Sequence, residues 1–186
     1  ALFDDCYISE SAFMWTKFDE VTFSNTLVDD TRFAFSNLSR AQFVSETQLH
    51  DCNFGDTQLQ CANFSNAILI DCEFEDAVAP DVTIHDSCMA RILIKKSNFL
   101  GLKISDSVVD FLRIHDTNLS GSSWDSITSV IGRWFMYQND FTASYFSLCD
   151  TKKSRWLKNS FFGVVMERCN WFQSRLKKCD FEESTM

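Results

Sequence analysis

Large apolar residues recur at every fifth position along almost the whole chain of 186 residues. They form three runs, 3–43, 49–124 and 131–186, separated first by one inserted residue and then by two more within 126–130. A five-residue period matches neither the 3.6-residue repeat of an α-helix nor the two-residue alternation of a single β-strand. The period therefore predicts a solenoid of short repeats.

A second series of mostly small residues, chiefly Ala, Ser, Thr and Cys, lies two positions before each large residue. If each pentapeptide forms one side of a square, four sides close a coil of about 20 residues, with the large residue inside and the small residue at the inner wall. About thirty-seven repeats then make about nine coils, whose backbones stack at the roughly 4.8 Å spacing of paired strands. The chain is thus predicted to be all-β, a quadrilateral parallel β-helix that occupies 1–186 as a single domain.

Several positions test this assignment. The bulky residues Ile92, Leu112 and Trp134 take the small inner position, and the repeat places them one above another on the same side of the predicted coil. Two central positions depart from the pattern, because Ala79 (before Pro80) is small and Thr151 is polar. We expect local loosening or a loop at both.

Three segments resemble the pentapeptide-repeat family, whose motif is A(D/N)LxX with Phe common at the centre. They are CNFGD at 52–56, ANFSN at 62–66 and CEFED at 72–76. The resemblance covers nearly the whole chain and implies a right-handed quadrilateral β-helix. Members of the family range from gyrase-binding DNA mimics to domains of secreted bacterial effectors, so the resemblance leaves the function open.

Charge is distributed unevenly along the chain. Residues 1–86 carry 16 acids and 3 bases, a net charge of −13, whereas residues 87–186 carry 10 acids and 14 bases, a net charge of +4. A partner can sense such an asymmetry at a distance. The alternative is that the acidic residues only maintain solubility.

The ends of the sequence fall inside the repeat pattern, so we expect the chain to be a fragment of a longer protein. No run of apolar residues approaches the roughly 18 to 20 that a membrane helix needs, and the N-terminus lacks the features of a signal peptide. We therefore expect no membrane insertion.

Six of the eight cysteines take the small inner position, namely Cys6, Cys52, Cys72, Cys149, Cys169 and Cys179. Side chains in parallel register point alongside rather than toward each other, so buried free thiols are favoured over disulfides or metal ligands. Free thiols indicate a reducing compartment, the cytoplasm or the host cytoplasm for a secreted effector. Cys61 and Cys88 lie outside the series and are expected to be the more reactive.

Residues with the chemistry of catalysis do not form a recognisable group. His50, His85 and His115 follow central residues, lack cysteines at zinc-ligand spacing, and are interpreted as solvated. No phosphate-binding loop, nucleophile elbow or paired catalytic carboxylates appear. We therefore predict no catalytic, cofactor or metal site, and hence no enzymatic activity for this stretch of chain.

Aromatic residues at outward positions are concentrated in the last third of the chain, interleaved with basic residues. An exposed aromatic and basic surface is typical of a protein interface, either with a separate partner or with an adjoining domain of the same chain. The predicted protein-binding surface comprises Phe135, Tyr137, Tyr145, Phe162, Phe172, Lys152 and Arg155.

The family resemblance gives two functional hypotheses. The first is an interaction or substrate-recognition domain of a larger bacterial effector, similar to the β-helix that precedes the catalytic domain in HECT-like ubiquitin-ligase effectors. The second is a stand-alone DNA mimic that binds a topoisomerase such as gyrase, which the acidic half favours. Direct nucleic-acid binding is disfavoured, because the net charge of −9 opposes it.

Overall fold

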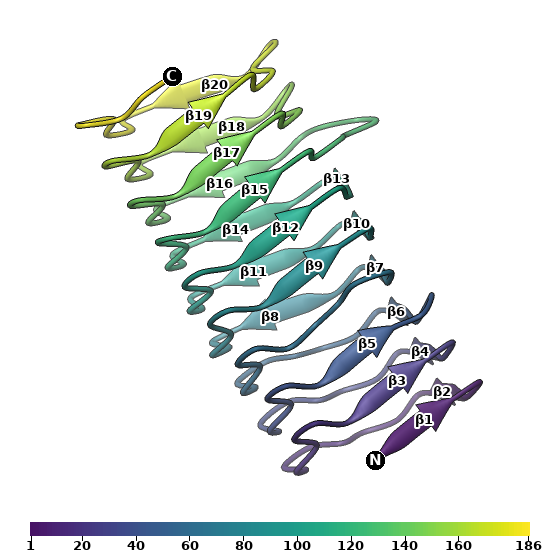
Figure 1. Ribbon diagram of the computed structural model, residues 1–186. Helices are drawn as coiled ribbons and strands as arrows, with labels where there is room; N and C mark the ends of the chain where they lie inside the picture. Colours follow the sequence, from purple (N-terminus) through teal and green to yellow (C-terminus); the bar gives the residue numbers. More distant parts are fainter.

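The computed structural model describes residues 1–186 as a straight stack of about nine coils with the two termini at opposite ends (Figure 1). Its regular elements are twenty strands of three residues each, and none is a helix. The structure accordingly contains no helix that is long and apolar enough to cross a membrane. This confirms the predicted all-β solenoid.

The strands are β1 (Leu2–Asp4), β2 (Tyr7–Ser9), β3 (Thr22–Ser24), β4 (Leu27–Asp29), β5 (Gln42–Val44), β6 (Gln48–His50), β7 (Ile68–Ile70), β8 (Glu73–Glu75), β9 (Thr83–His85), β10 (Cys88–Ala90), β11 (Leu93–Lys95), β12 (Lys103–Ser105), β13 (Val108–Asp110), β14 (Arg113–His115), β15 (Ser123–Asp125), β16 (Phe135–Tyr137), β17 (Tyr145–Ser147), β18 (Arg155–Leu157), β19 (Val165–Glu167) and β20 (Arg175–Lys177).

The four sides of the coil are named in chain order. Side 1 contains β1, β3, β5, β9, β12, β15, β17 and β19. Side 2 contains β2, β4, β6, β7, β10 and β13, and side 3 contains β8, β11, β14, β16, β18 and β20. Side 4 has no strand and is joined by single bridges, such as Asn118 with Asp140. Every strand pair is parallel, as expected when each coil repeats the path of the last.

The turn at each corner is made by a residue with a left-handed backbone, and most of these residues are not glycine. Asp, Asn and other polar residues take φ values near 50°, for example Asp56 at 53° and Asn66 at 53°. Short polar side chains tolerate this conformation better than most others do. The frequent Asp and Asn residues of the repeat therefore allow the chain to turn sharply with only five glycines.

Two ladders of phenylalanine rings form the core of the first half. On side 1, Phe43 stacks on Phe64 with ring centroids 4.8 Å apart, and on side 3, Phe54 stacks on Phe74 at 4.9 Å. Rings of the two ladders meet edge to face, as Phe54 and Phe64 do at 89°. All four are essentially inaccessible to solvent. Both geometries are favourable for aromatic pairs, by about 0.5–1.5 kcal/mol each beyond the burial of their area.

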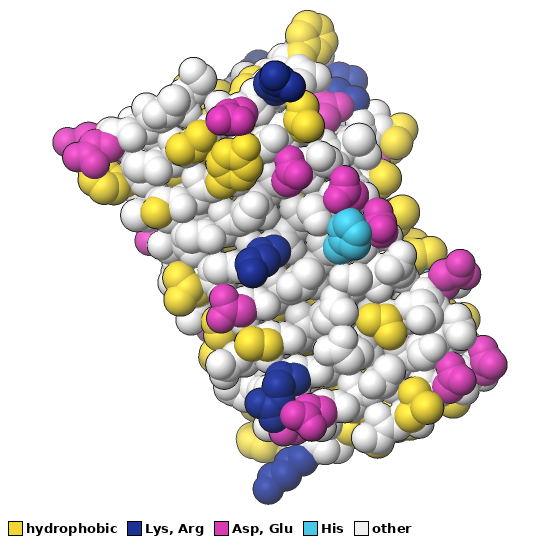
Figure 2. Space-filling view, viewed as in Figure 1, with side chains coloured by type: hydrophobic (Ala, Val, Ile, Leu, Met, Phe, Trp, Pro, Cys, Tyr) yellow, Lys and Arg dark blue, Asp and Glu magenta, His cyan; other side chains and the backbone are white.

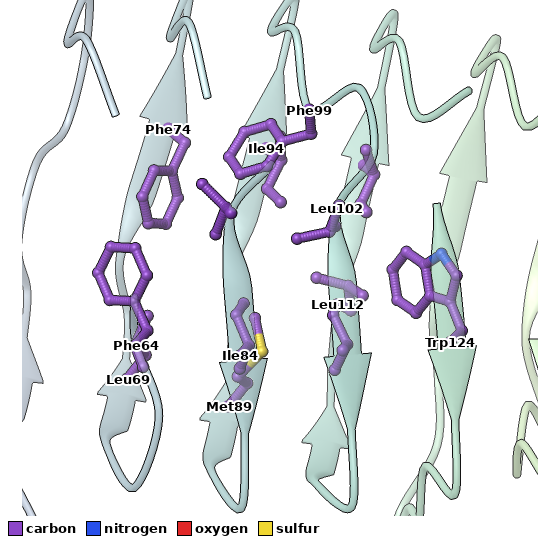
Figure 3. A pocket seen from close by; sticks show the side chains of 13 residues that line it. Phe64, Leu69, Phe74, Ile84, Met89, Ile94, Phe99, Leu102, Leu112 and Trp124 are labelled. Carbon is purple, nitrogen blue, oxygen red and sulfur yellow. The ribbon is translucent and has the colours of Figure 1, made fainter. Parts of the chain in front are cut away.

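Between Phe74 and Trp124 the core becomes mainly aliphatic. Figure 3 shows Leu102 and Leu112 between these two aromatic residues, around an internal void of about 10 Å³ lined only by apolar side chains. The bulky inner residues Ile92, Leu112 and Trp134 are buried one above another on side 3, as predicted. A void of this size and lining does not attract water, so this part of the core is dry.

The loosening predicted at Ala79 and Thr151 does not occur. Ala79 is fully buried and its amide donates to Asn98 at 2.8 Å, while Val82 and Phe99 line the neighbouring interior. Thr151 is also fully buried, because its hydroxyl donates to the Asn170 carbonyl at 3.0 Å. The prediction considered only the central side chain, whereas the bonds between coils and the neighbouring side chains maintain the path of the chain.

The second insertion lies later than predicted. Thr128 pairs with Val108, so Ser129 takes the central position of side 2, and the two extra residues enlarge the corner loop 130–133. Ile131, predicted to be a core residue, is 42% exposed in this loop. Ser129 suffices at the centre because the large indole of Trp134 is buried nearby and donates to the Val109 carbonyl at 2.9 Å.

Of the six inner cysteines, Cys52, Cys72 and Cys149 are buried as predicted, whereas Cys6, Cys169 and Cys179 are only half-buried; all eight cysteines are free. The Cys52 thiol donates to the His50 carbonyl at 3.3 Å, and the Cys149 thiol donates to the Ser147 carbonyl at 3.3 Å. Hydrogen bonding with Cys72 and burial raise the pKa of Cys52, and Cys169 and burial act likewise on Cys149. These thiols therefore stay protonated, whereas Cys61 and Cys88 are exposed.

The Phe54→Ala substitution should lower the free energy of unfolding by about 3–5 kcal/mol, because it removes a buried ring and leaves a cavity between two stacked neighbours. Urea denaturation measures this change. Val130→Ala, at a position that is 77% exposed, should change the free energy by less than about 0.5 kcal/mol. A loss below about 1 kcal/mol for Phe54→Ala would contradict the packing described above.

Candidate functional site

One concave surface is a groove of about 840 Å³ that runs over side 3 next to its corner with side 2. We call it the side 3 groove. Its lining consists of Leu93, Phe111, Arg113, His115, Arg133, Trp134, Phe135, Lys153 and Arg155. Residues separated by more than 40 positions in the sequence thus share one surface.

Two parallel rows build the groove. In the strand row, Arg113 of β14 pairs with Phe135 of β16, which pairs with Arg155 of β18. Because the strands are in parallel register, these three side chains leave the same face of the sheet at successive coils. The corner row follows the turn beside them and contains Phe111, Arg133 and Lys153, each with a left-handed backbone.

The enlarged corner loop shapes one wall of the groove. Asp110, at the end of β13, accepts hydrogen bonds from the Ser129 hydroxyl and from the amides of Ile131 and Gly132, the latter two at 3.0 Å. Gly132 has φ of 78°, and a Cβ there would lie 2.3 Å from the Lys152 carbonyl oxygen. Only glycine fits this close approach. The loop, which includes Arg133, is therefore held in place.

Arg113, Arg133, Lys153 and Arg155 form no ion pair in the structure, although other basic residues do. Arg91 contacts Asp71 at 2.6 Å, for example. The guanidinium of Arg133 lies 5.9 Å from the centre of the Phe111 ring, a cation–π arrangement that leaves its charge uncompensated. The groove is thus a concentrated positive surface on a protein of net charge −9.

Side 1, which lies opposite the side 3 groove, has a different arrangement of charged side chains. Figure 2 shows side 1, on which acidic and basic side chains are interspersed. Along the corner row itself, the first four coils carry Glu10, Asp30, Asp51 and Asp71 where later coils carry the groove residues. Acidic and basic halves therefore succeed each other along one edge of the protein.

The predicted protein-binding residues do not form one surface. The structure brings together Phe135, Tyr137 and Arg155 on side 3. The other four are distributed over the remaining sides, with Tyr145 on side 1, Lys152 and Phe172 on side 2, and Phe162 on side 4. Because the chain turns a corner every five residues, neighbours in sequence point in different directions.

The prediction missed Arg113, Arg133 and His115. The sequence contains a signal for them, because the stacking rule that aligned Ile92, Leu112 and Trp134 also aligns the outward residues before and after these three. Applying that rule to outward positions, with 22 residues per coil across the second insertion, places Arg113 beside Phe135.

His50, His85 and His115, all predicted to be solvated, are half-buried. His85 lies near Asp86 at 3.0 Å and Asp106 at 3.4 Å. His50 is enclosed at its Nε2 atom, which has no hydrogen-bond partner. Its outer neighbours on β4 and β7 cover it, because outward side chains of adjacent coils are only about 4.8 Å apart. No group of three or more Cys, His, Asp or Glu residues has metal-binding geometry.

The groove therefore offers positive charge and aromatic surface rather than a nucleophile with its base. It can bind anions through arginine forks and pack flat apolar groups against Phe135, which is 38% exposed.

Comparison with known proteins agrees with the five-residue geometry. The family profile described as "Pentapeptide repeats (8 copies)" matches residues 47–83 and 57–91. The resemblance to the pentapeptide-repeat family is thus confirmed over residues 47–91. No curated protein matches it by sequence.

Solved structures similar to this chain include HetL from the cyanobacterium Nostoc, a pentapeptide repeat protein involved in heterocyst differentiation regulation. The match covers 98% of this chain and 88% of HetL at 11% identity, with a TM-score of 0.33. QnrB1, a plasmid-mediated fluoroquinolone resistance protein, matches over 97% of this chain and 91% of its own at 12% identity and a TM-score of 0.37.

A pentapeptide repeat protein from the Arabidopsis thaliana thylakoid lumen matches over 55% of this chain and 67% of its own, at 20% identity and a TM-score of 0.41. At such identities and TM-scores, none of the three structures carries an argument about the function of this chain.

Asp110 should make stability depend on pH. Partial burial raises its pKa, but hydrogen bonds from Ser129 and the loop amides lower it more, so the pKa lies below the ordinary 3.8. A depressed pKa stabilises the fold above pH 3.8, and the contribution is lost as pH falls through the folded-state pKa. Asp110→Asn should cost about 1–2 kcal/mol at pH 7 and progressively less as pH falls below 3.8. Denaturation across pH 2–7 measures the difference; a constant difference would contradict the assigned role.

Proposed function

We propose that this protein is a non-catalytic scaffold that binds a protein partner through the side 3 groove. The observation that carries the proposal is the convergence of four cations without ion pairs around the exposed ring of Phe135. Arg and aromatic residues are the types enriched among residues that dominate binding at protein interfaces. A partner with complementary negative charge would associate faster and bind in a defined orientation.

The stacked coils support a recognition role rather than a catalytic one. Parallel pairing fixes the spacing of outward side chains, and the buried side chains of successive coils limit relative movement. A surface held in this way is preorganised for binding, which reduces the entropy lost on association.

The finer proposal concerns the protein to which this stretch of chain belongs. On the family resemblance, we infer that it is a substrate-recognition domain of a larger secreted bacterial effector, of the kind that resembles HECT-like ubiquitin ligases. The adjoining domain would then supply the catalysis. The free cysteines fit the reducing cytoplasm of a host cell.

An alternative function rests on the acidic half. The corner row of Glu10, Asp30, Asp51 and Asp71 repeats a carboxylate at each coil, a regular array that suits a DNA mimic binding a topoisomerase. Under this alternative, micromolar protein should inhibit supercoiling by gyrase, and Asp30→Asn with Asp51→Asn should weaken the inhibition. Unchanged supercoiling with micromolar protein would remove the alternative.

The scaffold function predicts that binding depends on the groove. The double substitution Arg113→Glu, Arg155→Glu should abolish the capture of specific proteins from a eukaryotic host-cell lysate, because it reverses the groove's charge. Arg168→Glu, an exposed substitution at a different corner, changes the charge without touching the groove and should leave capture intact. Quantitative mass spectrometry of the captured proteins measures both effects. Recovery of the same proteins by all three forms would overturn the proposal.

A further inference from the structure

We propose that the side 3 groove binds a short acidic segment in the polyproline II conformation, with carboxylates three residues apart. The inference rests on the proposed scaffold function and names the chemistry of the partner. Its basis is the spacing of the groove residues, their charge, and the position of an exposed aromatic ring between two arginines.

The spacing comes from the register of the strands. Arg113 pairs with Phe135 and Phe135 with Arg155, so the two arginines are two coils apart. At about 4.8 Å per coil, their backbones are separated by about 9.6 Å along the long axis. A polyproline II helix rises about 3.1 Å per residue and has three residues per turn, so side chains at i and i+3 share a face about 9.3 Å apart.

An extended β-strand fits these arginines less well. Its side chains return to the same face at every second residue, about 6.7 Å or 13 Å apart. An α-helix places residues i and i+4 about 6 Å apart along its axis, and residues i and i+7 about 10.5 Å apart. The polyproline II repeat is thus the regular conformation whose period is nearest to the two-coil separation of Arg113 and Arg155.

The chemistry between the arginines fits the same ligand. Phe135 lies midway between them and is 38% exposed, so a proline or other apolar residue at i+1 or i+2 can pack on its ring. Aromatic-lined grooves are a recurring binding site for polyproline II segments. Each arginine offers a planar fork that suits a carboxylate. Arg133 and Lys153 in the adjacent corner row add charge beside the ligand's path.

The charge pattern favours a short peptide over a nucleic acid strand. The corner row becomes acidic at Asp71, and Glu73 precedes Leu93 in the strand row. A long polyanion that leaves the groove toward the N-terminal coils would meet the half of the chain with net charge −13. A segment with two or three carboxylates contacts only the basic coils.

The test is fluorescence anisotropy with a labelled peptide that contains Glu-Pro-Pro-Glu. Three unlabelled competitors define the specificity: the same peptide with Gln for Glu, a peptide of the same composition with adjacent glutamates, and a single-stranded oligothymidylate. We expect the labelled peptide to bind, and the competitors to displace it at least about tenfold less well than unlabelled Glu-Pro-Pro-Glu peptide does.

Variants connect binding to the groove. Arg113→Gln, Arg155→Gln and Phe135→Ala should each weaken binding about tenfold, whereas Arg168→Gln should not change it. Circular dichroism confirms that each variant keeps the fold.

The proposal is overturned if the peptide with adjacent glutamates binds equally well, if the oligothymidylate binds more tightly, or if the groove variants bind like the wild type. Absence of peptide binding would also overturn it. If groove charge reversal still abolishes protein capture in that case, the scaffold function stands and only the acidic polyproline II ligand fails.

Discussion

The hydrogen bonds between successive coils are the constraint on which the rest of the structure depends. Of 123 backbone hydrogen bonds, only 32 lie within the named strands, so most of them continue through the corners and single bridges. Asp56 at a corner donates to Glu75 of the next coil at 2.8 Å, just as residues along the sides do. Because the backbone is paired in this way, the register fixes both the coil in which a residue lies and the side of that coil on which it lies.

This pairing determines what the interior and the surface can contain. Inside, it brings identical side chains to the stacking distance of about 5 Å that phenylalanine ladders use. Outside, it arranges side chains in columns with one coil per step. The side 3 groove is a consequence of two such columns, and the corner loop around Gly132 adds its wall without interrupting the bonds, since Phe135 still donates to Leu112 at 2.8 Å.

Much of the fold was predictable from the sequence, because the five-residue period directly records which side chains point inward. The prediction was wrong at individual central positions where one group compensates for another. Ser129 is central because Trp134 supplies the bulk, and Thr151 stays buried because its hydroxyl finds a carbonyl. Such compensation depends on neighbours in adjacent coils, which a pattern of single positions does not contain.

The candidate site was less predictable than the core. Closeness in sequence suggested one aromatic and basic surface, but the corners distribute it over four sides. Which cations remain without a carboxylate partner depends on side-chain contacts between coils, such as Arg91 with Asp71. These contacts are set by register, so the 22-residue step between Arg113 and Phe135 decides whether the groove exists.

That register is therefore the most direct test of the structure. Nuclear Overhauser contacts between backbone protons of the isotopically labelled protein measure it across β14, β16 and β18. The structure predicts contacts that join Ile114 to Met136 and Met136 to Trp156. Contacts that join Ile114 to Trp134 would show a uniform 20-residue repeat, and would contradict both the corner insertion and the groove.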